Sequence, residues 1–164
     1  MTTPPKPAPE ETAFWQKRLA SQANNRAWAL ADQLSRTPDE DEEMLQAAHA
    51  AMFFWKIIGT PKNHAHAAQL LAHVYALGHL PKPASFYLDK SNAFFQVAQN
   101  EPWEIAFTLL VNANVAHAAC KFTEHRHFYE QAQTTIANLA DPEDQNILQK
   151  SFASVPKPVS GEAP

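Results

Sequence analysis

The chain has 164 residues, 45% of them hydrophobic, and its 17 acidic and 13 basic side chains give a formal net charge of −4. This balance argues against a nucleic-acid-binding protein, which would carry a basic surface. The length suits one domain with a sizeable core. The three glycines argue against sheets and phosphate-binding loops, and the single cysteine, Cys120, excludes an intrachain disulfide.

The two ends of the chain differ from its middle. Residues 1–9 include four prolines and almost no apolar side chains, and residues 156–164 are similar. We predict two disordered tails around a single domain at residues 10–155. Residues 1–11 lack the apolar core of a signal peptide, and no segment reaches the about 20 apolar residues of a membrane span. We therefore expect a cytoplasmic protein.

The first half of the domain predicts two helices. Apolar residues at spacings of three and four predict a helix from Glu10 to near Ser35, in which Asn24-Asn25 allow a break. Thr37-Pro38 then starts a second helix, with Glu40 completing a capping box and Gly59 ending it in a left-handed conformation. Between residues 47 and 58 only His49 and Lys56 are polar. This pattern predicts a helix buried on most sides, at the centre of the core.

The second half predicts five more helices. Thr60-Pro61 starts the third, which runs to Leu77 and is closed by Gly78. The others are expected to begin near Pro83, Pro102, His125 and Pro142. The chain is thus predicted to be all-α, with about seven helices and short connections that make neighbouring helices antiparallel.

A weak internal repeat organises these helices. Phe86-Tyr87 and Phe128-Tyr129 are 42 residues apart, and the same offset aligns several other apolar positions. The third and fourth helices therefore form one predicted hairpin, and the fifth and sixth form its copy. Stacked helix hairpins are typical of an α-solenoid.

Two motifs point to a family. Ala72-x-x-Tyr75-x-x-Gly78 and Asn100-x-Pro102 resemble the tetratricopeptide repeat (TPR), although the repeat is longer than the usual unit. The segment from Asn25 to Pro156 also resembles a group of uncharacterised bacterial TPR-like proteins. This resemblance implies a right-handed stack of antiparallel hairpins and a bacterial origin. It brings no catalytic residues to this chain.

The eight histidines are the first candidates for chemistry. His64-x-His66 and His125-x-His127 have the spacing of metal pairs, but residues two apart lie on roughly opposite sides of a helix. The sequence holds no HExxH, CxxC or zinc-type cysteine–histidine spacing. We expect neither a metal nor a cofactor.

Two polar strips at helical spacing suggest a groove. The third helix carries His66, Gln69 and His73 on one face, and the fifth is expected to carry Asn114, His117 and Lys121. In TPR stacks the first helices of successive hairpins line the concave surface, so these strips would lie side by side. They could bind a peptide carboxylate or an acidic segment. The alternative is that both strips are hydrated outward faces.

Three functions follow. The leading hypothesis is a small scaffold or adaptor that holds a protein or peptide partner in this groove, with Tyr75 and Trp103 as further contacts. The second is an enzyme acting on a small molecule, which would use His49 with an acid of residues 39–43 or another histidine. A buried histidine is more often hydrogen-bonded structurally than catalytic. The third is a homo-oligomer formed through the apolar side chains of Phe53, Phe54, Phe94 and Phe95.

Overall fold

The computed structural model describes residues 8–159. Residues 1–7 and 160–164, which hold most of the two predicted tails, lie outside this range. Within it the chain forms seven helices and no strand, so the all-α prediction is confirmed. The helices are α1 (Pro9–Ala31), α2 (Pro38–Ile58), α3 (Pro61–Leu77), α4 (Pro81–Phe95), α5 (Pro102–Ala118), α6 (Phe122–Ala137) and α7 (Pro142–Ala153).

Local sequence explains where the helices begin. All of them except α6 have proline as their first residue, where the missing N–H costs no hydrogen bond. The predicted capping box of α2 is confirmed: the Thr37 hydroxyl accepts from the Glu40 N–H, and the Glu40 carboxylate accepts from the Thr37 N–H. Thr60 and Asn63 form the same arrangement at the start of α3.

Several predicted boundaries are wrong. Helix α1 ends at Ala31 and is unbroken at Asn24-Asn25. Helix α4 begins at Pro81 rather than Pro83, because the first turn of a helix needs no backbone donors and accepts proline at either place. Helix α5 ends at Ala118, since Cys120 adopts a left-handed φ of 57° that a helix cannot contain.

The two predicted glycine terminators act differently from expectation. Gly78 has a φ of −80°, and the following residue, His79, takes the left-handed conformation with a φ of 55°. Gly59 has an extended backbone with a φ of −85°. A Cβ at Gly59 would lie 2.5 Å from the Trp55 carbonyl oxygen. Glycine is thus needed there for close packing rather than for a positive φ.

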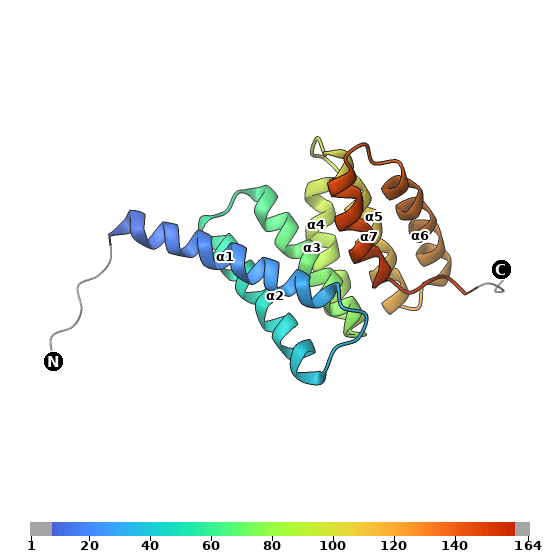
Figure 1. Ribbon diagram of the computed structural model, residues 1–164, viewed down its shortest axis with the longest axis horizontal. Coiled ribbons are helices and arrows are strands. Elements are labelled where there is room, and N and C mark those ends of the chain that lie inside the picture. The colour runs from blue at the N-terminus through green and yellow to red at the C-terminus, as the bar shows by residue number, and fades with distance from the viewer. Residues whose placement is uncertain (1–7, 160–164) are drawn as a thin grey trace.

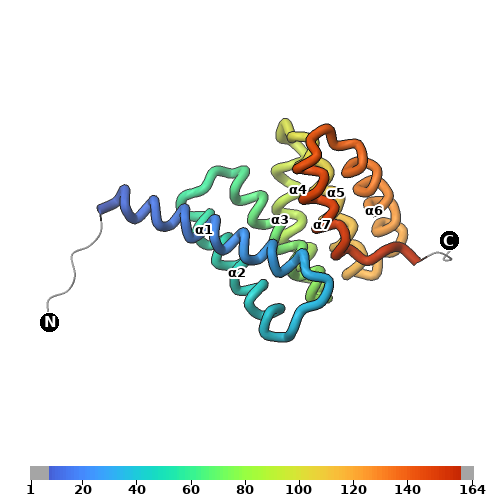
Figure 2. Tube along the Cα trace, in the orientation of Figure 1, coloured from blue at the N-terminus to red at the C-terminus, as the bar shows by residue number. Residues whose placement is uncertain are grey.

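The helices pair into hairpins that stack side by side. The most extensive contacts join α1 to α2, α3 to α4 and α5 to α6, and α3 also packs on α1, α2 and α5 (Figure 1). Helix α7 covers α5 and α6. The N-terminal part of α1 projects beyond the rest of the stack (Figure 2). The expected right-handed sense of the stack stays a prediction.

The structural repeat is 41 residues long, so the predicted offset of 42 is wrong by one. Pro61 and Pro102 start α3 and α5, and the left-handed residues His79 and Cys120 end the two turns after them, all 41 apart. Helix α7 begins 40 residues after α5, at Pro142. The Phe-Tyr pairs misled because Phe86 is exposed, whereas the buried aromatic residue of the second pair is Tyr129. Helix α7 is thus the first helix of a third unit.

The central core helix is α3 rather than α2. Ten residues of α3 are buried, against four of α2, because α3 has neighbours on several sides. On α2 the buried residues follow one stripe, and Phe53 and Ile57 are exposed. Trp28, Tyr75 and Tyr87 contact both hydrophobic clusters of the domain and join them into one core. Among residues 8–159, no helix is long and apolar enough to cross a membrane.

Candidate functional site

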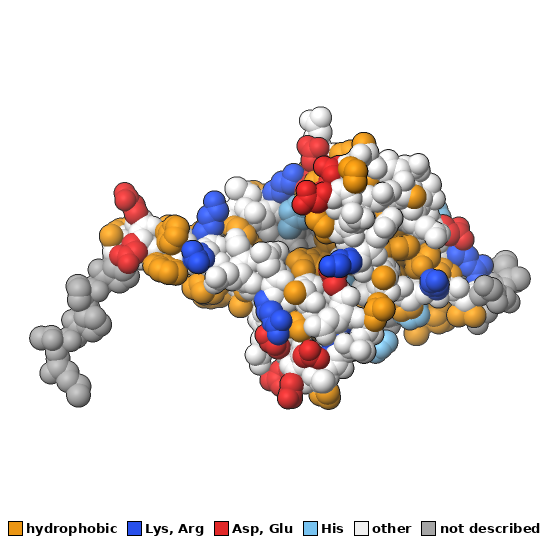
Figure 3. Space-filling model, viewed as in Figure 1, with side chains coloured by type: hydrophobic (Ala, Val, Ile, Leu, Met, Phe, Trp, Pro, Cys, Tyr) orange, Lys and Arg blue, Asp and Glu red, His pale blue; other side chains and the backbone are white. Residues whose placement is uncertain are grey.

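A cavity of about 460 Å³ lies among α1, α3, α5, α7 and the end of α2. Its apolar walls are Trp28, Trp55, Trp103, Phe107, Ile147 and Leu148. These walls hold three of the four tryptophans of the chain. In Figure 3 hydrophobic side chains gather on this face, where α1 and α7 approach each other, with charged side chains around them. The cavity has the size and apolar character of a ligand site.

The repeat explains why these side chains converge. His66, Phe107 and Ile147 stand at the same place in α3, α5 and α7, six residues after the helix caps Thr60, Glu101 and Asp141. All three line the cavity. The first helices of successive hairpins therefore present equivalent positions to one hollow, as the groove prediction requires. A polar network holds α3 and α5 together at its edge.

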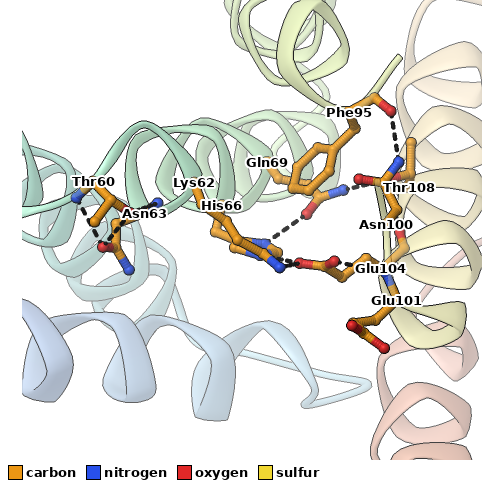
Figure 4. A network of polar contacts seen from close by, with 10 residues as sticks. All are labelled: Thr60, Lys62, Asn63, His66, Gln69, Phe95, Asn100, Glu101, Glu104 and Thr108. Atoms are coloured by element: carbon orange, nitrogen blue, oxygen red, sulfur yellow. Dashed lines mark hydrogen bonds and ion pairs between the residues drawn. The ribbon is translucent and has the colours of Figure 1, made fainter. Parts of the chain in front are cut away.

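The centre of this network is Glu104 on α5, whose side chain is fully buried. Its Oε1 atom accepts from Lys62 Nζ at 2.8 Å and from His66 Nε2 at 2.9 Å (Figure 4). Its Oε2 atom accepts from the backbone N–H of Glu101 at 2.9 Å. Burial alone would raise the pKa of Glu104, but these three donors outweigh it and lower the pKa below its usual range. Glu104 is therefore a charged carboxylate inside the protein.

The orientation of His66 is fixed from both sides of its ring. Gln69 donates its amide N–H to Thr108 Oγ1 at 3.0 Å, so its carbonyl oxygen faces His66 Nδ1 at 3.3 Å. Because Nδ1 meets this acceptor and Nε2 meets Glu104, both ring nitrogens act as donors. The His66 ring also stacks on Trp103, with centroids 5.4 Å apart and planes 12° apart. These contacts order one wall of the cavity.

A second polar cluster lies deeper between the same helices. His73 is completely buried and stacks on Trp28 with ring centroids 5.4 Å apart. Asn114 Nδ2 donates to His73 Nδ1 at 3.0 Å, so the ring proton is on Nε2, which donates to Ser154 Oγ at 3.4 Å. Burial, helped by Arg36, lowers the pKa of His73 to about 3. His73 is thus neutral and cannot take a proton from Ser154.

The structure places the six predicted groove residues in different surroundings. His66 lines the cavity, whereas Gln69, His73 and Asn114 are buried between α3 and α5. The alternative of hydrated outward faces is wrong for these three side chains. Their polar atoms bond to one another and to Thr108 and Ser154, and a partner docking on the surface would not reach them.

The last two predicted groove residues lie at the other end of α5. His117 is half-buried against His125, with ring centroids 4.9 Å apart, and burial lowers its pKa. Lys121 is the residue before α6 and pairs with Glu124 at 3.3 Å. It does not share a helical face with Asn114, because α5 has already ended at Ala118. A role of these residues in partner binding stays a prediction.

His49 does not line the cavity. It is half-buried, its Nε2 lies 2.7 Å from the Tyr75 hydroxyl, and burial lowers its pKa. Residues 39–43 lie one to three turns away, roughly 9–15 Å along the helix axis. No group of three or more histidines, cysteines or acids within residues 8–159 could hold a metal ion. The enzyme hypothesis therefore loses the convergence of groups that it required.

The four phenylalanines predicted to form an oligomer interface do not form one exposed surface. Phe53 is exposed, Phe54 and Phe94 are half-buried, and Phe95 is buried against His66. Homo-oligomerisation itself stays a prediction.

Sequence reasoning missed the residues that form most of the cavity, among them Trp28, Asp32, Glu104 and Ile147. The signal that could have found them is the recurrence of a capping residue followed by proline at Thr60, Glu101 and Asp141. Counting six residues on from each gives His66, Phe107 and Ile147. Comparison of the chain with protein-family models, curated proteins and solved structures gives no match.

Proposed function

We propose that this protein is a small TPR-like interaction module that holds a segment of a protein partner in the cavity among α1, α3, α5 and α7. The observation that carries the proposal is the aromatic and aliphatic lining, contributed by equivalent positions of successive repeats. Exposed apolar surface of this kind marks binding sites more often than it marks a stable free surface. The resemblance to bacterial TPR-like proteins supports the same class and a bacterial, cytoplasmic setting.

The histidines favour binding over catalysis. His73 donates to Ser154 and therefore does not activate it as a nucleophile. His66 has both nitrogens bonded within the chain, and His49 is bonded to a tyrosine away from the cavity. Each of these contacts joins two helices, which is what a rigid scaffold needs to keep a groove preformed.

The cavity suits a few side chains of a partner segment rather than a whole folded surface. Its volume lies in the range of small-molecule sites, roughly 300–1,000 Å³. Aromatic walls give large contact area with little loss of conformational freedom, and they are enriched at binding hot spots. Trp103 is held in place by His66, so removal of its ring should weaken binding without removing a helix contact on the far side of the stack.

A peptide library displayed on phage and selected on the pure protein tests the proposal. Selected peptides should bind the wild type and lose affinity at least about tenfold on Trp103→Ala or Ile147→Asp. Phe86→Asp is the matched control, since Phe86 is 55% exposed and Ile147 is 54% exposed, but Phe86 lies on α4 away from the cavity. Peptides that bind Trp103→Ala and Ile147→Asp as tightly as wild type would contradict the proposal.

A further inference from the structure

Two acids face the cavity without a basic partner. Asp32, the residue after α1, and Asp144 on α7 both line it. Neither forms an ion pair with any of residues 8–159. Asp32 accepts one hydrogen bond, from Ser151 Oγ to its Oδ1 at 2.7 Å, and within the same residues its Oδ2 has no partner. A half-buried carboxylate in this state is incompletely compensated.

The other charged groups around the cavity are already balanced. Lys62 and His66 both bond to Glu104, and Arg36 pairs with Asp41 at 2.6 Å. Lys150 on α7 is the cation nearest in effect to Asp32, and it lowers the pKa of that carboxyl without forming an ion pair. Burial acts the other way, is the larger influence, and raises the pKa of Asp32. A cation entering the cavity would relieve this cost.

The walls beside Asp32 suit a cation as well as an apolar group. Trp28 lies one turn before Asp32 on the same helix and lines the same cavity with Trp55 and Trp103. Indole faces attract ammonium and guanidinium groups, and tryptophan does so best among the aromatic residues. Asp32 also follows the C-terminal end of α1, where the helix dipole favours positive charge. Aromatic walls and acidic groups therefore favour the same occupant.

We infer that the cavity accepts an arginine or lysine side chain of the partner segment, with Asp32 as its counter-ion and Trp28 beside its charged group. This rests on the proposed function and reverses the charge expected from the sequence, which predicted an acidic segment. The cation fits between α1 and α7, and it takes the oxygen of Asp32 that Ser151 leaves open. Asp144 adds a second negative charge at the α7 side.

The indole N–H signals in proton–nitrogen NMR spectra test this inference. Acetyl-Gly-Arg-Gly-amide should shift the signals of Trp28, Trp55 and Trp103 but not that of Trp15, which lies outside the cavity. The citrulline peptide has the same shape without the charge and should bind at least about tenfold more weakly. Equal binding of the two peptides, preference for the glutamate analogue, or no shift of the three signals would overturn the inference.

Matched variants assign the charge to Asp32. Asp32→Asn keeps an oxygen for Ser151 and should weaken the arginine peptide about tenfold while leaving the citrulline peptide unchanged. Asp39→Asn makes the same charge change on the exposed first turn of α2 and should have no effect. If ethylguanidinium ion alone binds as tightly as the peptide, the occupant is a small cation and the docked side chain is overturned.

The failure of this inference can be told apart from that of the proposed function. Phage-selected peptides that lose affinity on Trp103→Ala but bind Asp32→Asn unchanged would keep the groove and overturn the cationic anchor. Selected peptides that are unaffected by Trp103→Ala would overturn the proposed function instead.

Discussion

Helices α3 and α5 are joined by two buried polar sites that handle charge in opposite ways. Near the helix starts, Glu104 is fully buried and remains ionised. Two turns further along, His73 is equally buried and remains neutral. The difference is the kind of partner: Glu104 accepts from Lys62, His66 and a backbone N–H, whereas His73 has only an amide and a hydroxyl. Burial alone thus does not decide whether a side chain is charged.

The two sites also differ in what they can do for binding. The Glu104 site lies at the edge of the cavity and fixes His66, which forms part of its wall. The His73 site lies behind Trp28 and connects α3, α5 and the end of α7. The first site therefore orients groups that a ligand would meet, and the second keeps the stacked helices in register.

Lowering the pH should have the largest effect, and it should act through His73. The unfolded chain binds a proton at His73 below about pH 6.5, while the folded chain does not until about pH 3, so stability falls as the pH falls between these values. Each pH unit in this window costs about 1.4 kcal/mol. Between pH 7 and pH 4 the free energy of unfolding should fall by about 3 kcal/mol through this residue.

The variant His73→Asn isolates that contribution, since it places at position 73 the residue that stands at the equivalent position 114. It should be less stable than the wild type at pH 7, and the difference should shrink by about 3 kcal/mol at pH 4. His49, His117 and the carboxylates also titrate but are the same in both proteins. Denaturant unfolding at each pH gives the comparison. Parallel pH profiles for the two proteins would show that His73 is not the buried neutral group described above.

Removing the charge of Glu104 should have the next largest effect. Glu104→Gln keeps the shape of the side chain but places an amide N–H against one of three donors, so the free energy of unfolding at pH 7 should fall by about 1–3 kcal/mol. Glu124→Gln is the control, because Glu124 also pairs with a lysine but its side chain is 55% exposed. It should cost less than about 0.5 kcal/mol. Similar losses for both variants would remove the contrast between buried and exposed carboxylates.

Helix starts could be predicted from the sequence because they depend on neighbouring residues. Thr37 with Glu40 and Thr60 with Asn63 form the reciprocal bonds of a capping box over three residues. Helix ends were harder to predict, since His79 and Cys120 take left-handed conformations that their side chains do not favour. There the packing of the next helix decides the turn.

The polar strips were located on the right helices but in the wrong surroundings. Gln69, His73 and Asn114 have the side chains of a hydrated face, and nothing local distinguishes that from a buried network. Their partners Thr108 and Ser154 are 39 and 81 residues away from the residues they bond. Bonds over such distances in sequence depend on how the hairpins stack. The same holds for the cavity, which needs α1 and α7 to close it.

Removing Lys62 should have the smallest effect, although it bonds to the same oxygen as His66. The Lys62 side chain is 45% exposed, so water and salt already weaken its interaction with Glu104. Lys62→Met keeps the apolar stem and should lower the free energy of unfolding by at most about 1 kcal/mol, with the difference lost in 1 M salt. Thermal unfolding at low and high salt measures it. A loss as large as that of Glu104→Gln would mean that His66 and the Glu101 N–H cannot hold the buried carboxylate without a full cation, and the ordered wall of the cavity would then depend on a surface lysine.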